Sequence, residues 1–224
     1  MKITNIGQAG LLIETKAVTI MVDPYFTDSV GAIDPKKHRR VPMDDRLWQV
    51  RPDVLIFTHD HLDHYDPESA ERILKTHKGI TVLSPNSVWQ KVRLQGGDHN
   101  YVLFDRHTQW TEKEIRFAAV KAAHSDGFAI GVIVKAEGKT LYVTGDTLYN
   151  TEIFGDLPEQ IDMIFLPVNG VGNNMNANDA ARFVKKCGAK MAVPMHVGMF
   201  DDLTGHILEV ENKVVLGTYE SLEG

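Results

Sequence analysis

The sequence contains only one cysteine, Cys187, which excludes a framework of internal disulfide bonds. Positive charge is also scarce, because 24 Lys and Arg stand against 30 Asp and Glu and give a formal net charge of -6. Nucleic-acid binding generally needs a basic face, so we expect no nucleic-acid partner. No apolar run approaches the ~18 residues that span a bilayer, and the first five residues lack the apolar core of a secretory signal. We therefore expect a cytoplasmic protein without a membrane partner.

Linkers and low-complexity segments are missing as well. No stretch rich in Pro, Gly or Ser and no run of like charge divides the 224 residues. A chain of this length can bury one sizeable core. We predict a single domain over residues 1–224, and the sequence leaves its oligomeric state, including a homo-oligomer, open.

Coordinating side chains, in contrast, are concentrated in the short segment 58–64, which reads T-H-D-H-L-D-H. It follows Val54–Phe57, an apolar run typical of a buried strand. It precedes Pro67 and Glu68, which suit a first helical turn, and a helical pattern over Ser69–Lys75. Surface histidines without a ligand role would leave four coordinating groups together with no purpose. The segment therefore predicts a metal site on a rigid loop between a strand and a helix.

Strands dominate the first part of the chain, and strands alternate with helices in the second. Residues 11–14 and 18–22 predict a hairpin, and Gly138-Lys139 marks a second hairpin turn. Further strands are predicted at 80–83, 115–120, 128–134, 140–143, 163–168 and 191–194, and an amphipathic helix at 178–186. This order indicates an α+β or α/β protein built as a four-layer αββα sandwich.

One arrangement recurs three times in the second half: an apolar strand runs directly into a coordinating residue. The residues that follow these strands are His124, Asp146 and His196. Any one of them alone would more often be an ordinary core or edge residue. Together with H-x-H-x-D-H, however, the three form a coherent set of metal ligands.

These motifs, in this order, resemble those of the metallo-β-lactamase superfamily, and the resemblance covers most of the chain. It implies the metallo-β-lactamase fold and two metal ions. Carried over by position, one ion is held by His59, His61 and His124, the second by Asp63, His64 and His196, and Asp146 bridges them. Asp23 corresponds to the first motif and is expected to support the ligands without binding a metal.

The ligand types suit zinc first and manganese second, and they also accept iron. Flavin-linked di-iron relatives typically carry Glu where this chain has His61, so we disfavour oxygen reduction. Two ions can provide a bridging hydroxide at neutral pH and polarise the scissile bond. Asp63, His64 and Asp146 are the residues to which we assign catalytic roles, with Asp63 orienting the water and passing a proton.

The segments Gly7–Glu14, Val22–Tyr25 and Leu62–Asp66 look like the L-ascorbate-6-phosphate lactonase-like branch and its short relatives. True zinc β-lactamases generally have Cys where this chain has Asp146, which disfavours antibiotic hydrolysis. We expect a hydrolase acting on a small anionic ester, a lactone or a sugar-phosphate-like metabolite. A phosphodiesterase is the alternative within the enzyme class, and a metal-bound binding protein without turnover is the alternative outside it.

Two loops and four histidines have open roles at this stage. The basic run Lys36–Arg40 either contacts an anionic substrate group or is a solvated loop, and the second is favoured. The Gly/Asn-rich loop Asn169–Asn176 either borders the pocket with amide donors or simply makes turns, with Asn176 as a helix N-cap. His206 is a candidate for the pocket rim. The other histidines are predicted to be exposed and unconnected with the cluster: His77, His99 and His107.

Overall fold

The computed structural model describes residues 1–224 and contains two sheets packed face to face. The 7-stranded sheet has the order β13-β1-β2-β3-β4-β5-β6, and the 6-stranded sheet has the order β12-β11-β10-β9-β8-β7. The first sheet consists of β1 (Lys2–Gly7), β2 (Gly10–Glu14), β3 (Thr19–Val22), β4 (Val54–Ile56), β5 (Thr81–Ser84), β6 (Asn100–Leu103) and β13 (Ser221–Glu223). The second consists of β7 (Gln109–Glu112), β8 (Ile115–Lys121), β9 (Ile130–Ala136), β10 (Lys139–Val143), β11 (Met163–Pro167) and β12 (Met191–Met195).

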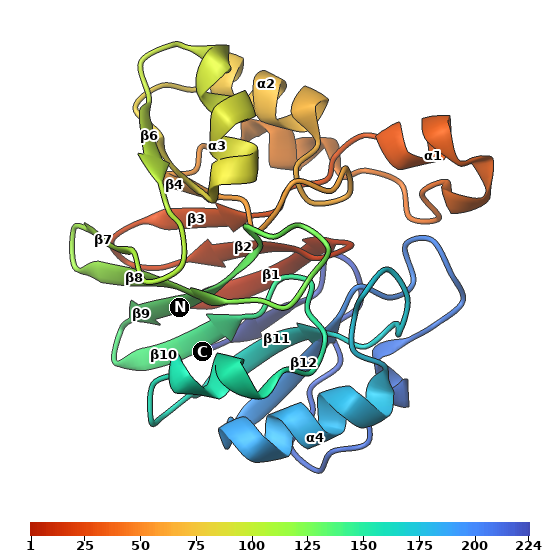
Figure 1. Ribbon diagram of the computed structural model, residues 1–224. Coiled ribbons are helices and arrows are strands. Elements are labelled where there is room, and N and C mark those ends of the chain that lie inside the picture. The colour runs from red at the N-terminus through yellow and green to blue at the C-terminus, as the bar shows by residue number, and fades with distance from the viewer.

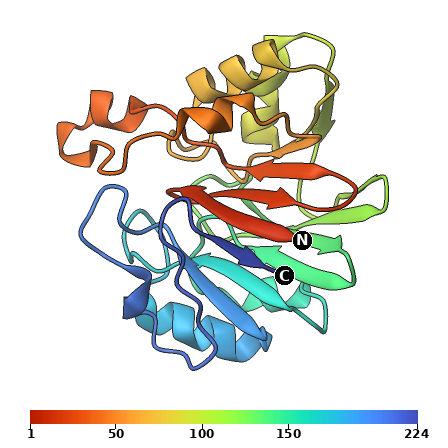
Figure 2. The same cartoon turned by 180° about the vertical axis from the view of Figure 1, so that it is seen from behind.

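Helices cover the outer face of each sheet (Figures 1 and 2). The helices α2 (Pro67–Thr76) and α3 (Asn86–Val92) pack on the first sheet, and α4 (Ala177–Cys187) packs on the second. The short α1 (Ser29–Ile33) stands apart from α2 and α3, on a loop that projects to one side (Figure 1). Five short 3-10 helices lie at Pro35–Lys37, Asp45–Gln49, Arg93–Gln95, Thr151–Gly155 and Gly205–Ile207. The four layers confirm the predicted αββα sandwich. None of the helices is long and apolar enough to cross a membrane.

The core between the sheets is built from inward-facing residues of both. Its 23 buried members include Leu11 and Val22 of the first sheet and Phe117 and Phe165 of the second. Two further clusters lie between each sheet and its helices. Residues from both halves of the chain thus share one contiguous central cluster.

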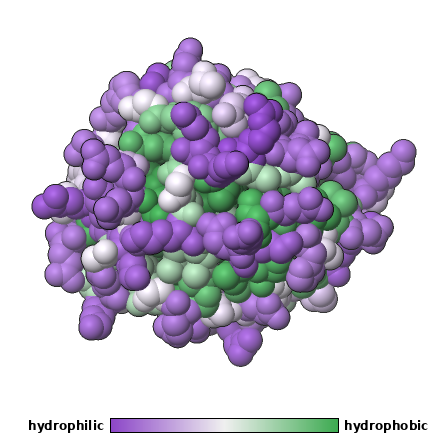
Figure 3. Space-filling model, turned by 90° about the horizontal axis from the view of Figure 1, so that it is seen from below, coloured by the Kyte–Doolittle hydropathy of each residue, from purple (hydrophilic) through white to green (hydrophobic).

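Helix α4 shows how local sequence fixes these layers. The side chain of Asn176 accepts a hydrogen bond from Asp179 N at the helix start, and Gly188 takes the left-handed conformation at its end. Phe183 is buried against the sheet, whereas charged residues such as Arg182 are exposed. The face of the molecule that includes α4 accordingly shows apolar areas crossed by hydrophilic side chains (Figure 3).

Strand direction places the loops that matter for function at one edge. In the first sheet β3 to β6 are parallel, and in the second β10, β11 and β12 are parallel. Strand β9 is antiparallel to both β8 and β10, so β8 ends at the same edge as β10. The carboxyl ends of parallel strands open onto one side of a sheet. The segments that follow β3, β4, β8, β10, β11 and β12 therefore converge there.

The structure differs from the sequence predictions at several points. The hairpin turn occupies Glu137 and Gly138, one residue earlier than predicted, because both have positive φ (50° and 75°), as a tight two-residue hairpin turn requires. The prediction that His77 and His99 are exposed was wrong. Both are half-buried, and their Nε2 atoms contact the carbonyl oxygens of Trp48 (3.2 Å) and Leu74 (2.9 Å), respectively. His107 is exposed, as predicted.

Candidate metal centre

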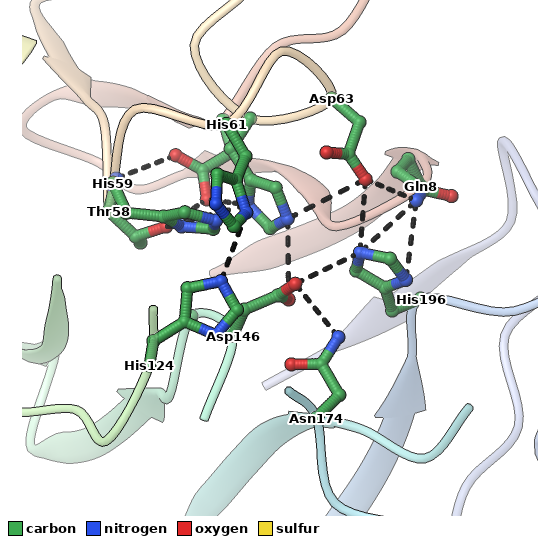
Figure 4. A network of polar contacts seen from close by, with 12 residues as sticks. Gln8, Thr58, His59, His61, Asp63, His124, Asp146, Asn174 and His196 are labelled. Carbon is green, nitrogen blue, oxygen red and sulfur yellow. Dashed lines mark hydrogen bonds and ion pairs between the residues drawn. The ribbon is translucent and has the colours of Figure 1, made fainter. Parts of the chain in front are cut away.

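All seven predicted ligands meet at the shared edge of the two sheets, where the loops converge (Figure 4). The loop after β4 provides four of them, and the segments after β8, β10 and β12 provide one each: His59, His61, Asp63, His64, His124, Asp146 and His196. Segments up to 137 residues apart in sequence thus meet in one place, since the first of these ligands is residue 59 and the last is residue 196.

The donor atoms fall into three overlapping groups, each with its atoms within 4.8 Å of one another. These groups are His59, His61 and His124; His59, His64 and Asp146; and Asp63, His64 and His196. The first and the last of these coincide with the two ligand sets that the family resemblance implies. We call them the first group (His59, His61 and His124) and the second group (Asp63, His64 and His196). Asp146 belongs to the middle group, which shares His59 with the first group and His64 with the second. Its Oδ1 lies 3.3 Å from Nε2 of His64, and its Oδ2 lies 3.3 Å from Nε2 of His196.

Unsatisfied buried atoms show that these residues fit a metal. The Nε2 atoms of His59 and His64 and Oδ1 of Asp146 are buried and have no hydrogen-bond partner. Leaving such polar groups unpaired is costly, so a cation that accepts their lone pairs would compensate for the loss of water. Five imidazoles and two carboxylates without a thiolate suit zinc, manganese or iron. The thiol of Cys187 contacts the carbonyl of Val184 within α4 and belongs to another part of the molecule.

Asp23 orients two of the imidazoles from behind. Its Oδ2 lies 2.8 Å from Nδ1 of His64 and accepts a 2.6 Å hydrogen bond from the hydroxyl of Thr58. That hydroxyl oxygen in turn lies 3.1 Å from Nδ1 of His59. With their Nδ1 atoms directed to oxygen, both rings turn Nε2 toward the centre, where it can bind a metal once it carries no proton. This position agrees with the supporting role expected for Asp23.

The other two imidazoles of the first group are also held by oxygen atoms. Nδ1 of His124 lies 3.2 Å from the carbonyl oxygen of Asn173, and Nε2 of His61 lies 3.2 Å from the hydroxyl of Ser125. The remaining ring nitrogens, Nε2 of His124 and Nδ1 of His61, are 3.0 Å apart and face the centre.

Burial and mutual charge shift the pKa values of these groups in opposite directions. Burial, together with the nearby charge of His64, holds the pKa of His59 well below its usual value. Burial also acts to lower the pKa of His196, but the carboxylates of Asp146 and Asp63 outweigh it and raise that pKa to about 10. The same carboxylates raise the pKa of His64 against its burial. The second ligand group is therefore a charged, hydrogen-bonded cluster, and an ion entering it must displace protons.

Three side-chain amides complete the second group. Sequence reasoning left Asn169 and Asn174 open, as members of a loop with two interpretations, and missed Gln8. Nε2 of Gln8 donates a 2.7 Å hydrogen bond to Oδ2 of Asp63, and Nδ2 of Asn174 donates a 2.8 Å bond to Oδ2 of Asp146. Nδ2 of Asn169 lies 3.0 Å from Nδ1 of His196. The loop Asn169–Asn176 thus borders the site, which was one of its two sequence interpretations. The backbone of Gln8 has φ 53°, an uncommon value for a residue with a Cβ, but the sequence offers no signal for it.

A cavity of about 520 Å³ opens above the second group, with Asp63, Asp146 and His196 in its wall. Val30, Val171 and Phe200 provide apolar lining, and Lys37 provides a cationic side chain. Three other members of the basic run are engaged elsewhere: His38 contacts Asp28, Arg39 donates to the carbonyl of Tyr25, and Arg40 pairs with Asp202. Lys36 is exposed and does not line the cavity. Lys37 is thus the member of the basic run that faces the cavity. His206 lines a second cavity, of about 360 Å³, which also reaches Gln8 and His196.

Residues 18–197 match the profile of the beta-lactamase superfamily domain. The chain is 31% identical to a UPF0173 metal-dependent hydrolase of Geobacillus thermodenitrificans, with 89% of this chain and 87% of the relative covered. Among solved structures, the metallo hydrolase Igni18 of Ignicoccus hospitalis is similar with a TM-score of 0.76 at 20% identity, covering 99% of this chain and 97% of that one. An isothiocyanate hydrolase from Delia radicum gut bacteria has a TM-score of 0.77 at 19% identity, covering 100% and 99%. The fold and the ordered motifs agree with the family profile and with these relatives. The chain therefore belongs to the metal-dependent hydrolases of the metallo-β-lactamase superfamily.

Proposed function

We propose that the protein is a dinuclear hydrolase that cleaves a small anionic ester, either a lactone or a sugar-phosphate-like metabolite. The observation behind this proposal is the pair of donor groups, with Asp146 between them and with buried, unpartnered Nε2 atoms on His59 and His64. In this proposal His59, His61 and His124 hold one ion, and Asp63, His64 and His196 hold the other. Zinc is the preferred ion, and manganese or iron would suit the same donors.

When bound, two divalent ions would make hydroxide available at neutral pH and polarise the scissile carbonyl or phosphoryl oxygen. The protein's own residues orient the water and accept its proton. Oδ2 of Asp63 is held by Gln8 and lies 3.1 Å from Nε2 of His196, which fixes the orientation of the carboxylate. Its other oxygen, Oδ1, makes no hydrogen bond with the protein and is available to orient the attacking water and accept its proton.

The cavity supports a small substrate with an anionic group. Its volume of about 520 Å³ falls within the range of small-molecule sites. Lys37 offers a positive charge in its lining, and Asp63 and Asp146, which belong to the donor cluster, line the same cavity. A substrate bound with its anion toward Lys37 would direct its ester group toward the donor cluster.

Metal-loaded protein should be assayed on a panel of lactones and on a bis-aryl phosphodiester, with protein treated with a chelator as the control. Lactone hydrolysis that requires the metal is the expected result. Hydrolysis of the phosphodiester alone would replace this proposal with a phosphodiesterase, since the same two-metal chemistry serves phosphoryl centres. Binding of both ions without turnover of any substrate would instead support a metal-bound binding protein.

The proposed role of Asp63 can be tested separately. Asp63→Asn keeps the shape of the side chain and one oxygen but removes the general base. We expect kcat to fall by about 10²–10⁴-fold, the usual contribution of a positioned base. A variant that keeps both ions and full activity would remove Asp63 from the mechanism.

A further inference from the structure

In each of the five site imidazoles, one ring nitrogen faces the centre of the cluster and the other faces away from it. In four of the five rings, the nitrogen that faces away lies next to an oxygen atom. The oxygens belong to Thr58 for His59 (3.1 Å), Ser125 for His61 (3.2 Å), Asp23 for His64 (2.8 Å) and Asn173 for His124 (3.2 Å). An oxygen there accepts the ring N–H and leaves the other nitrogen free to bind a metal.

His196 is the exception. Its Nε2 faces the centre, 3.1 Å from Oδ2 of Asp63 and 3.3 Å from Oδ2 of Asp146. Its Nδ1 meets amide nitrogen instead of oxygen: Nδ2 of Asn169 lies 3.0 Å from Nδ1, and Nε2 of Gln8 lies 3.2 Å from both Nδ1 and Nε2 of the ring. At the same time Oδ1 of Asn169 is buried and has no hydrogen-bond partner. Both anomalies concern the same side chain.

A rotation of one amide removes both anomalies. An imidazole that binds a metal through Nε2 retains its proton on Nδ1, and that proton needs an acceptor. Amide nitrogens cannot accept it. The oxygen and nitrogen of an Asn side chain are nearly alike in shape and are assigned from the hydrogen-bond network. Turning the Asn169 amide by 180° places its unpartnered oxygen opposite Nδ1 of His196.

Gln8 cannot serve as the acceptor, because its amide is fixed by another contact. Its nitrogen donates to Oδ2 of Asp63 at 2.7 Å, and an ionised carboxylate accepts hydrogen bonds only. The backbone supports this placement, since the carbonyl of Gln8 accepts a 3.1 Å hydrogen bond from His196 N. The two amides beside His196 therefore have opposite requirements.

We propose that Asn169 is a positioning residue whose carbonyl oxygen accepts the Nδ1 proton of His196 and directs Nε2 toward the second ion. This inference rests on the proposed function, because it assumes that His196 is a ligand. It adds to that function a residue from the loop after β11 that touches neither ion. It also assigns Gln8 the complementary role of donor to Asp63.

The opposite requirements provide the test. Asn169→Asp retains an acceptor, so the dissociation constant of the second ion should stay within threefold of the wild-type value. Asn169→Leu removes the acceptor and should raise that dissociation constant by about 10–100-fold. At Gln8 the acidic substitution should be harmful, because Gln8→Glu places a second carboxylate against Asp63. It should raise the dissociation constant of the second ion. The first ion should be unchanged in all three variants. Asn100→Leu, at an exposed asparagine of β6, is the matched control.

The readouts are stepwise dissociation constants from chelator competition, the absorption spectrum of the cobalt(II) form, and the tautomer of His196 from ¹⁵N NMR of histidine-labelled protein. The expected tautomer has the proton on Nδ1 in the wild type and in Asn169→Asp. An Asn169→Asp variant as impaired as Asn169→Leu would show that Asn169 donates and would overturn the inference. Equal affinity in Asn169→Leu and the wild type would overturn it as well.

The same data separate the inference from the proposed function. A wild-type protein that takes up only one ion contradicts the dinuclear function. The inference about Asn169 is then tested by the NMR tautomer of His196 alone. A wild type with two ions and a proton on Nε2 of His196 contradicts the inference and leaves the function standing.

Discussion

Oδ2 of Asp23 lies 2.8 Å from Nδ1 of His64, and both side chains are almost completely buried, at 1% and 0% exposure. The same carboxylate accepts hydrogen bonds from the backbone N–H (2.8 Å) and the hydroxyl (2.6 Å) of Thr58. Because Thr58 also contacts His59, one buried carboxylate orients imidazoles of both proposed ion sites. Asp23 adopts a φ of 42°, and such backbone strain often accompanies functional positions.

Asp23→Asn should therefore weaken metal binding without removing a ligand. An amide can offer an oxygen to Thr58 or to His64 but directs its NH₂ group at one of these donors. We expect affinity for the ions to fall by about 10–100-fold and stability to fall by about 1–3 kcal/mol. Chelator competition and thermal unfolding measure the two effects. Asp98→Asn, at an exposed position, is the control, and equal behaviour of both variants would refute the role of Asp23.

Gly145 precedes Asp146 with a φ of 58°, and a Cβ there would lie 2.8 Å from the carbonyl oxygen of Ile130 and 2.9 Å from Cβ of Thr58. Gly145→Ala should lower stability by more than about 2 kcal/mol and reduce metal uptake, because strain and a backbone clash act together. Gly138→Ala is a matched control, since Gly138 also has positive φ (75°) but has nothing within 4 Å. It should cost only about 1 kcal/mol and leave metal uptake intact. Similar losses in both variants would show that the contacts around Gly145 do not matter.

Much of this architecture follows from the sequence. Apolar runs such as Val54–Phe57 predict buried strands because these strands are covered on both faces, and strand ends predict where His124, Asp146 and His196 lie. The predicted helices at 69–75 and 178–186 correspond to the longer α2 and α4. These elements depend on local pattern, which a sequence displays directly.

Elements that depend on distant partners could not be predicted. Strand β13 has only three residues and exists because it pairs with β1 at the other end of the chain. Gln8 reaches Asp63 across 55 positions, and its role follows from a turn conformation that no residue pattern marks. His99 was assigned to the surface because its neighbours are polar, yet its ring bridges Ile80 N and the carbonyl of Leu74. Tertiary contacts determine the positions of β13, Gln8 and His99.

Asp156 should make stability depend on pH in the acid range. The Arg106 guanidinium beside it holds the pKa of its carboxyl well below the usual range. A depressed folded-state pKa stabilises the protein above the unfolded value of about 3.9, and that stabilisation is lost as pH falls through the folded value. Asp156→Asn should cost about 1–3 kcal/mol at pH 7, and its difference from the wild type should narrow below about pH 4. Urea unfolding between pH 2 and 7 tests this, and a difference independent of pH would contradict it.

Lys37 should affect substrate binding more than chemistry. Lys37 lines the cavity, whereas the side chains that hydrogen-bond to Asp63 and Asp146 are those of Gln8 and Asn174. We expect Lys37→Ala to raise KM for an anionic substrate by about fivefold, equivalent to about 1 kcal/mol for an exposed charge contact, with kcat nearly unchanged. Lys36→Ala, at the neighbouring exposed lysine, should change neither value. A fall in kcat with constant KM would place Lys37 in the chemistry instead.

The proposal of two ions is tested most directly by elemental analysis of the purified protein after loading with zinc or manganese. The structure has two donor groups with Asp146 between them, so we predict two metal ions per chain. Asp63→Ala, which removes a donor from the second group only, should reduce the count to about one. Fewer than one ion per chain in the loaded wild type would contradict the metal centre itself.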